Sequence, residues 1–208
     1  MKSGIRSVFI LGALAALFAA GSSYWAGEHL SRAGQSVDDA RVATFKSYRI
    51  AQSLKALAAG YELTMNEFYS TVLKFPPYQK KAAAQQAAIE SELAELAALQ
   101  AGDVTAAAEL AGRFRGMAGL RADLEQALTA DEADWDAARE ALFKLNVLSV
   151  QAIQQADFLG QSASQRAAVL DSDWQARRAQ AILWQRIATA LALLAGALLV
   201  YSALRMKT

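Results

Sequence analysis

The sequence predicts an all-α, membrane-anchored protein: an antiparallel four-helix bundle with two long helices continuous with two transmembrane helices. Three observations predict this class. Long apolar stretches stand near both ends of the 208 residues, only two prolines occur in the chain, and apolar residues between the ends recur at steps of three and four. That periodicity is typical of helices that bury one face.

The two apolar stretches are Val8 to Trp25 and Ile187 to Leu204, and neither contains a charged residue. A bilayer-crossing helix needs about 20 mostly apolar residues, and a charge at its centre is costly. We therefore expect transmembrane helices at 8–26 and 184–204. For the first stretch, a cleaved signal peptide is the alternative, because Ala19 to Ser22 offers the small residues that a signal peptidase requires.

Basic residues predict the orientation. Lys2 and Arg6 precede the first stretch, and Arg205 and Lys207 follow the second. The positive-inside rule then places segments 1–7 and 205–208 in the cytoplasm. Residues 27–183 form an extracytoplasmic helical bundle with a membrane-proximal stalk.

The first long helix of this domain is expected to run from Glu28 to Phe75. Pro76 and Pro77 are expected to end it, because proline lacks an N–H and disfavours helical backbone in the residue before it. Apolar or tolerant residues mark its buried face: Ile50, Leu54, Leu57, Tyr61, Thr64, Phe68, Thr71 and Phe75.

Three further helices are expected at Tyr78 to Gln100, Val104 to about Thr129, and Trp135 to Leu204. Gly102 and Asp103 are expected to cap the ends that meet between the second and third. The acidic run from Asp131 to Asp136 suits the positive end of the last helix. The buried faces are predicted at Ala82, Gln86, Ile89, Leu93 and Leu96, and at Leu110, Phe114, Met117, Leu120, Leu124 and Leu128.

Helix lengths predict where the bundle ends. The second and third helices would each be about 35–40 Å long, and the flanking two more than about 65 Å outside the membrane. The short pair can cover only the far half of the long pair. We therefore expect a two-helix stalk, Glu28–Tyr48 against Gly160–Leu183, and a homodimer that covers it.

Composition argues against several function classes. There is no cysteine, one histidine (His29) and a net charge of +1. No thiol chemistry, zinc site or catalytic triad is expected, and nothing favours nucleic acid as a partner. We expect no enzyme activity, catalytic residue, cofactor or metal.

The topology, with the stretch from Gly60-Tyr61-Glu62-Leu63 to Pro76-Pro77-Tyr78, resembles the ligand-binding sensor region of bacterial methyl-accepting chemotaxis receptors and related sensor kinases. The resemblance covers nearly the whole chain. It implies a location in the bacterial inner membrane, with the main domain in the periplasm, and a small-molecule ligand at a dimer interface. In those families a relay module and signalling domain follow the second span. Here the sequence stops at Thr208, so we expect a membrane or periplasmic protein partner to supply the output.

Candidate ligand-binding residues are Tyr48, Arg49, Tyr61, Asn66 and Asn146. The segment Lys46-Ser47-Tyr48-Arg49-Ile50 resembles the one by which nitrate-sensing relatives hold an anion, and a guanidinium suits a planar oxyanion. An exposed or dimer-pairing Arg49 is the simpler reading. Asn66 and Asn146 are expected at similar depth, where buried amides line a pocket or fix register. Solvent exposure of both amides, and a core role for Tyr61, remain the alternatives.

The sequence thus predicts a sensor or signal-relay protein that binds the lipid bilayer, a second copy and a small ligand or partner. A non-catalytic structural accessory or scaffold subunit of a cell-envelope complex is the alternative. A scaffold would carry an exposed apolar patch, whereas a sensor would carry a defined pocket.

Overall fold

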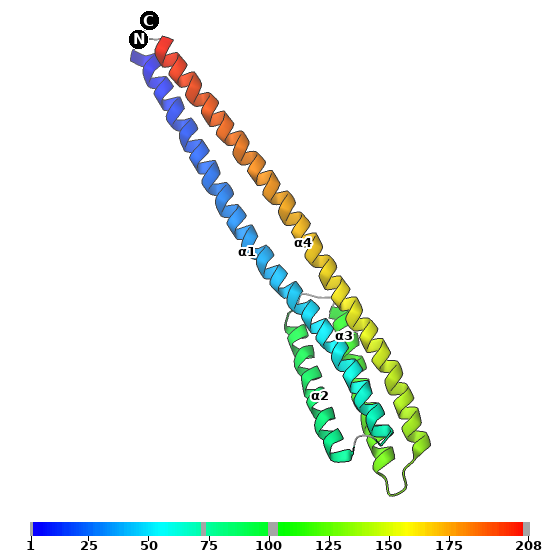
Figure 1. Cartoon of the computed structure of the whole chain (residues 1–208). Helices are drawn as coiled ribbons and strands as arrows, with labels where there is room; N and C mark the ends of the chain where they lie inside the picture. Colours follow the sequence, from blue (N-terminus) through cyan, green and yellow to red (C-terminus); the bar gives the residue numbers. More distant parts are fainter. Residues whose placement is uncertain (1, 72–73, 100–103, 206–208) are drawn as a thin grey trace. The chain divides into compact units, whose positions relative to one another are not determined.

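The chain folds entirely into α-helices in the part that the structure describes. A computed structural model describes residues 2–71, 74–99 and 104–205, with side chains for most of residues 17–201 inside those ranges. These ranges form α1 (Lys2–Tyr69), α2 (Phe75–Ala98), α3 (Val104–Thr129) and α4 (Trp135–Arg205), which pack against one another (Figure 1). The predicted all-α class is confirmed.

Two compact units divide the chain. Unit 1 consists of Met1–Asp39 and Val169–Thr208, and unit 2 of Ala40–Ala168. Helices α1 and α4 each contribute to both units, whereas α2 and α3 belong wholly to unit 2.

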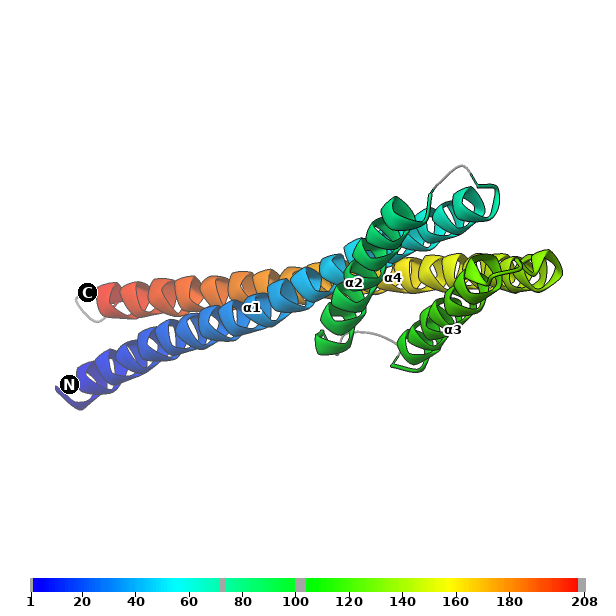
Figure 2. The same cartoon turned by 90° about the horizontal axis from the view of Figure 1, so that it is seen from below.

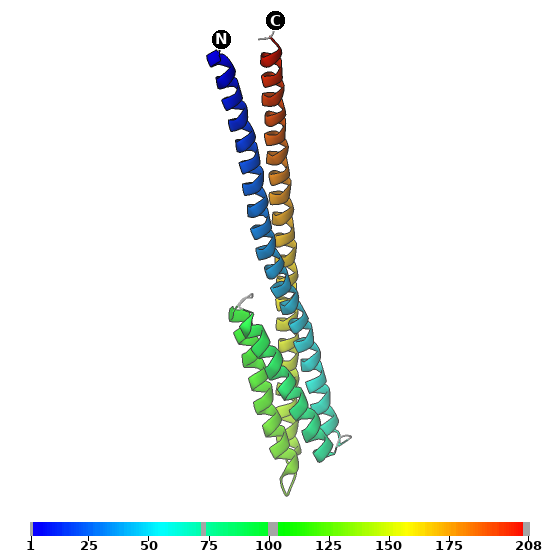
Figure 3. The ribbon, with the colours of Figure 1, turned by 90° about the vertical axis from the view of Figure 1, so that its left-hand side faces the viewer.

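Unit 2 holds the hydrophobic core. In it α2 lies along α1 and α3 along α4 (Figure 2 and Figure 3). The predicted faces of α2 and α3 are buried or half-buried throughout, which confirms the heptad-like periodicity. The largest fully buried side chains are Tyr61, Tyr78, Ile50, Leu54, Met65, Ile89, Leu110, Met117, Leu124 and Leu145.

Polar contacts between helices fix how unit 2 packs. Ser53 Oγ of α1 donates to Glu92 Oε1 of α2 at 2.8 Å, and Ser149 Oγ of α4 donates to the Ala58 carbonyl of α1 at 3.3 Å. Gly116 of α3 lies against α4, since a Cβ placed on it would meet Leu148 Cδ1 at 2.9 Å. These contacts link each short helix to one of the two long ones.

The junction between α1 and α2 differs from the prediction. Helix α1 ends at Tyr69, not Phe75, and Thr71 in the following turn has φ 62°. Phe75 instead begins α2, with the prolines in its first turn and Lys74 in extended conformation before it. Proline is tolerated there because the first N–H groups of a helix have no intrahelical partner, so the pair starts α2.

The start of α4 is capped as expected. Asp134 Oδ1 accepts a hydrogen bond from the Ala137 N–H at 2.9 Å, which satisfies a backbone donor of the first turn. The predicted caps at Gly102 and Asp103 lie outside the described residues.

The inner part of the predicted stalk belongs to unit 2. Thr44, Ser47, Leu159 and Ala163 are buried there, so this stretch of α1 and α4 is part of the packed core. In unit 1, by contrast, no described side chain is buried. Its closest helix approach is described at Gly34, where a Cβ would meet the Trp174 ring at 3.3 Å.

One helix of the described residues, Trp135–Leu198 of α4, contains a segment long and apolar enough to cross a membrane. Its leucines are exposed, Leu191 and Leu194 by 60% and 61%. Most side chains of the first predicted span, Val8 to Trp25, lie outside the described residues, although α1 runs through that segment.

Candidate functional site

A buried polar cluster joins three helices in unit 2. Tyr78 of α2 donates its hydroxyl proton to Glu125 Oε1 of α3 at 2.9 Å, and the hydroxyl oxygen lies 3.2 Å from Met65 Sδ of α1. Arg121 donates its Nε–H to the same carboxylate oxygen, one turn away on α3. We call Tyr61, Tyr78, Arg121 and Glu125 the tyrosine–arginine cluster.

Electrostatics in the cluster favours neutral tyrosines beside an ion pair. Burial raises the pKa of Tyr78 above its ordinary value of 10.0, and the hydrogen bond to Glu125 raises it further. Burial also raises the pKa of Tyr61, which the charge of Arg121 partly opposes. Burial lowers the pKa of Arg121, but Glu125 outweighs that effect and the net direction is up.

The arrangement suits helix positioning. The side chains of Arg121 and Glu125 are only 20% and 21% exposed, so each charge depends on the other for solvation. The Tyr78 ring stacks on Phe68 of α1 with centroids 3.9 Å apart. One tyrosine therefore couples the register of α2 both to α1 and to the α3 ion pair.

Two predicted site residues lie on the surface of α1. Arg49 pairs with Glu95 of α2, with Nη2 at 3.2 Å from Oε1, and its side chain is 60% exposed. Tyr48 is half exposed, and its ring lies 3.7 Å from where a Cβ on Gly160 would stand. A bound anion at Arg49 would compete with the Glu95 carboxylate.

The other three lie deeper. Tyr61 is buried, and its hydroxyl has no hydrogen-bond partner among the described residues. Asn146 of α4 likewise has a buried Oδ1 without such a partner, so its amide is buried, not solvent-facing. Asn66 is half-buried and donates to the Glu62 carbonyl one turn back at 2.9 Å.

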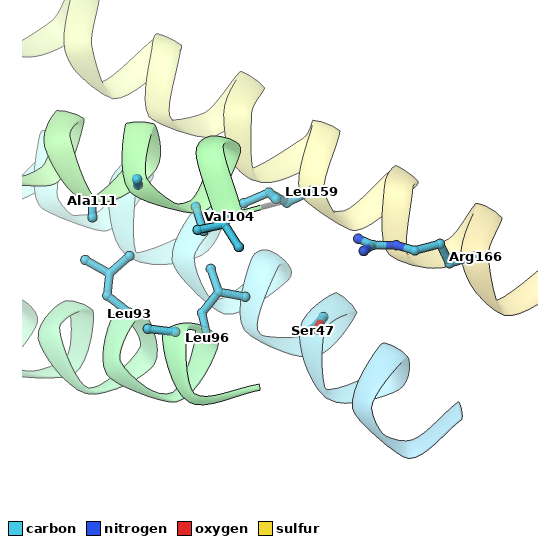
Figure 4. Close-up of a pocket in the computed structure, with 10 residues that line it drawn as sticks. Ser47, Leu93, Leu96, Val104, Ala111, Leu159 and Arg166 are labelled. Carbon is cyan, nitrogen blue, oxygen red and sulfur yellow. The ribbon is translucent and has the colours of Figure 1, made fainter. Parts of the chain in front are cut away.

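A pocket of about 230 Å³ opens within unit 2 between all four helices (Figure 4). None of the five predicted site residues lines it. Ser47 of α1 and Arg166 of α4 supply its polar side chains, and the remaining walls are apolar. Those walls are Leu93, Leu96 and Ala97 of α2, Val104, Ala107, Ala108 and Ala111 of α3, and Leu159 of α4.

The polar groups of the pocket are held in place by their own helices. Ser47 Oγ donates to the Ala43 carbonyl at 3.0 Å, which leaves its lone pairs toward a ligand donor. Arg166 Nε donates to the Ser162 carbonyl at 3.2 Å, and the guanidinium extends toward the pocket in Figure 4. The pocket therefore combines a mostly apolar interior with one fixed cation.

Sequence reasoning missed Tyr78, Arg121 and Glu125, and also Ser47 and Arg166. A signal existed for two of them. Arg121 and Glu125 stand four apart and each follows a residue of the predicted α3 face, which is where a partly buried pair forms. Arg166 continues the spacing of buried Leu159 and Ala163, so it is a cation on an apolar stripe.

The acidic run from Asp131 to Asp136 acts at the helix start. Asp136 pairs with Arg139 at 3.2 Å, in addition to the cap at Asp134. Within the described residues, no three or more His, Cys, Asp or Glu side chains gather where they could hold a metal ion.

Comparison of the chain with protein-family models, with curated proteins and with solved structures finds no match.

Proposed function

We propose that the chain is a membrane-anchored, chemoreceptor-like sensor or signal-relay protein. In this proposal its antiparallel four-helix bundle lies in the periplasm and both termini lie in the cytoplasm of a bacterial cell. The bundle binds a small ligand or partner as a homodimer and passes the change to another membrane protein. The sequence resemblance to chemotaxis-receptor sensor regions supports the same assignment.

One observation carries the proposal: α4 is a single unbroken helix that both lines the pocket and contains the apolar segment. Leu159 and Arg166 stand at the pocket, and Leu191 and Leu194 in the apolar segment. Because each peptide group in a helix is hydrogen-bonded to the next turn, a small shift at the pocket would travel along α4. A ligand drives such a shift only by the difference in its affinity for the two positions.

The membrane arrangement is tested by chemical labelling, since the chain has no cysteine of its own. We expect a single cysteine at Glu132 to react with a membrane-impermeant maleimide in spheroplasts. Cysteines at Ser3 and Lys207 should react only after the membrane is permeabilised. Labelling of Ser3→Cys and Lys207→Cys on opposite sides of the membrane would contradict the arrangement.

The relay is tested with Ala111→Leu, which fills the pocket and imitates occupancy. The readout is the fluorescence of Trp174 in a chain whose Trp25, Trp135 and Trp184 are replaced by Phe. A relay predicts a shifted Trp174 emission in the filled variant. The control is Ala118→Leu, the same change at a half-buried α3 position outside the pocket. Identical spectra for both variants would refute the relay.

A scaffold function is the second candidate, and a different observation favours it. One side of α4 in unit 2 exposes large apolar side chains at steps typical of one helix face: Phe143, Val147, Val150 and Phe158. An apolar stripe of this kind suits a protein partner. A scaffold predicts that Phe143→Ser with Phe158→Ser abolishes copurification with one envelope complex and leaves thermal stability unchanged.

A further inference from the structure

We propose that the pocket of unit 2 binds a short-chain aliphatic monocarboxylate, with Arg166 holding the carboxylate and the apolar walls holding the chain. This rests on the proposed sensor function and names the ligand class for it. The site is distinct from the segment around Arg49 that the sequence analysis selected for an anion.

The walls select an apolar body. Eight of the ten lining residues are Leu, Ala or Val. Ser47 has already committed its proton to the Ala43 carbonyl, so it offers a ligand little beyond an acceptor. A ligand with several hydroxyl or amide groups would leave them unpaired against these walls, at the cost of their hydration.

Charge selects an acid. Arg166 is the one charged side chain among the residues that line this pocket. A guanidinium matches a carboxylate by paired N–H donors, and such charge-assisted hydrogen bonds are about twice as strong as neutral ones. The first residue of α3, Val104, also lines the wall and brings the positive end of that helix.

An opposing contribution comes from Ala97 near the end of α2, because the C-terminal end of a helix carries partial negative charge. The two helix ends offset each other at roughly half a charge each, so the full charge of Arg166 decides the sign. No carboxylate lines the pocket, so the ammonium group of an amino acid would find no partner there.

Volume limits the chain length. At about 30 Å³ for a water-sized group, 230 Å³ accommodates on the order of eight non-hydrogen atoms. A carboxylate with five to seven further carbons fits this space, whereas a nucleotide or a full-length lipid chain does not. Octanoate and hexanoate are therefore suitable probes.

The experiment is equilibrium dialysis of labelled octanoate against the full chain in nanodiscs, with empty nanodiscs subtracted for partition into lipid. We expect one octanoate per chain, and at least tenfold weaker binding of uncharged 1-octanol. Arg166→Gln should weaken octanoate about tenfold or more and leave octanol unchanged, since it removes only the charged contact. Arg166→Lys should fall between the two.

Matched variants separate the pocket from general effects. Arg139→Gln removes an arginine of the same helix that pairs with exposed Asp136, and should bind octanoate as the unsubstituted chain does. Ala111→Leu should reduce binding of both octanoate and octanol, and Ala118→Leu should reduce neither. Circular dichroism melting curves identify any variant that fails to fold, and Arg166→Lys then supplies the test.

The proposal is overturned if octanoate shows no saturable binding, or if Arg166→Gln and Arg139→Gln bind it equally. The relay is judged separately by Trp174 emission. Saturable, Arg166-dependent binding without an emission change would uphold the ligand site and refute the sensor function. An emission change in Ala111→Leu without octanoate binding would do the reverse.

Discussion

At the scale of single residues, Arg121 and Glu125 form the most consequential charged pair in unit 2. Each side chain is about one-fifth exposed, and Glu125 also accepts the Tyr78 proton. Arg121→Met would leave the Glu125 charge without a partner, and should lower the free energy of unfolding by about 2 kcal/mol. Chemical denaturation in detergent measures this loss.

Adding Glu125→Gln to Arg121→Met should recover part of the loss, because the amide still accepts from Tyr78 and no charge remains unpaired. Arg139→Met is the control, since its ion pair with Asp136 lies in solvent and is worth little. Equal losses for Arg121→Met and Arg139→Met would show that the cluster does not stabilise the fold.

The tyrosines of the cluster predict a loss of stability at alkaline pH. The unfolded chain releases phenol protons near pH 10, whereas burial raises the pKa of Tyr61 and Tyr78 in the folded state. Above pH 10 the unfolded state therefore binds fewer protons, and the free energy of unfolding should fall as pH rises. Below pH 9 these two groups should contribute no pH dependence.

Urea denaturation between pH 8 and 11.5 measures this dependence. Tyr61→Phe and Tyr78→Phe should each flatten the fall above pH 10, and Tyr48→Phe, which changes a half-exposed ring, serves as the control. A slope that neither core variant changes would contradict the predicted linkage.

At the scale of elements, α3 contains three glycines in different surroundings. A Cβ on Gly112 or Gly119 would meet nothing within 4 Å, whereas one on Gly116 would meet Leu148 Cδ1 at 2.9 Å. Gly112→Ala and Gly119→Ala should each stabilise the protein by about 1 kcal/mol through helix propensity. Gly116→Ala should gain less, because Leu148 must move.

Thermal unfolding of the three glycine variants tests this order. The result that contradicts it is a gain for Gly116→Ala equal to the other two. Sequence spacing alone indicated close helix approach across this set, and the structure restricts the described close contact to Gly116.

The turn after α1 stores strain at Thr71. A β-branched residue at φ 62° is unfavourable, because the side chain crowds the backbone in the left-handed region. Thr71→Gly should therefore raise the free energy of unfolding by about 1 kcal/mol. Thr129→Gly at the end of α3 is the control and should not stabilise. A destabilised Thr71→Gly would show that the turn depends on the threonine side chain.

Helix interiors were predictable from sequence, and this junction was not. Steps of three and four locate buried faces such as Ile89 and Leu124 because packing repeats with the helix period. Prolines, however, are compatible both with stopping one helix and with starting the next. Which of the two occurs at Pro76 depends on the strained turn at Thr71, which no periodicity encodes.

The candidate site was largely beyond reach of the sequence for a related reason. The pocket joins Ser47, Leu96, Ala107 and Arg166, which lie far apart in the chain. Their meeting depends on the register between all four helices. Tyr61 was found because it falls on a buried face, whereas its neighbour Tyr78 was assigned only to the start of a helix.

At the scale of the whole molecule, the two units should differ in local stability. Unit 2 contains all of the side chains described as buried, and unit 1 contains none of them. Backbone amides exposed by local opening should therefore exchange sooner in Glu28–Asp39 and Val169–Trp174 than in the helices of unit 2. Hydrogen exchange with mass spectrometry in nanodiscs measures the difference.

A homodimer that covers the unit 1 segments would change this result in a concentration-dependent way. Protection of Glu28–Asp39 should then increase with protein concentration, while protection around Leu54 and Leu145 stays constant. Equal protection of both units at every concentration would contradict the expected difference in stability.

The unbroken course of α4 restricts how its length can change during evolution. Each added or deleted residue between Ala163 and Leu191 would turn everything beyond it by about 100°. Insertions of about seven residues come closest to whole turns and keep both ends of the helix facing as before. Homologous chains should therefore differ in this stretch by near-multiples of seven, whereas the loop between α3 and α4 is under no such restriction.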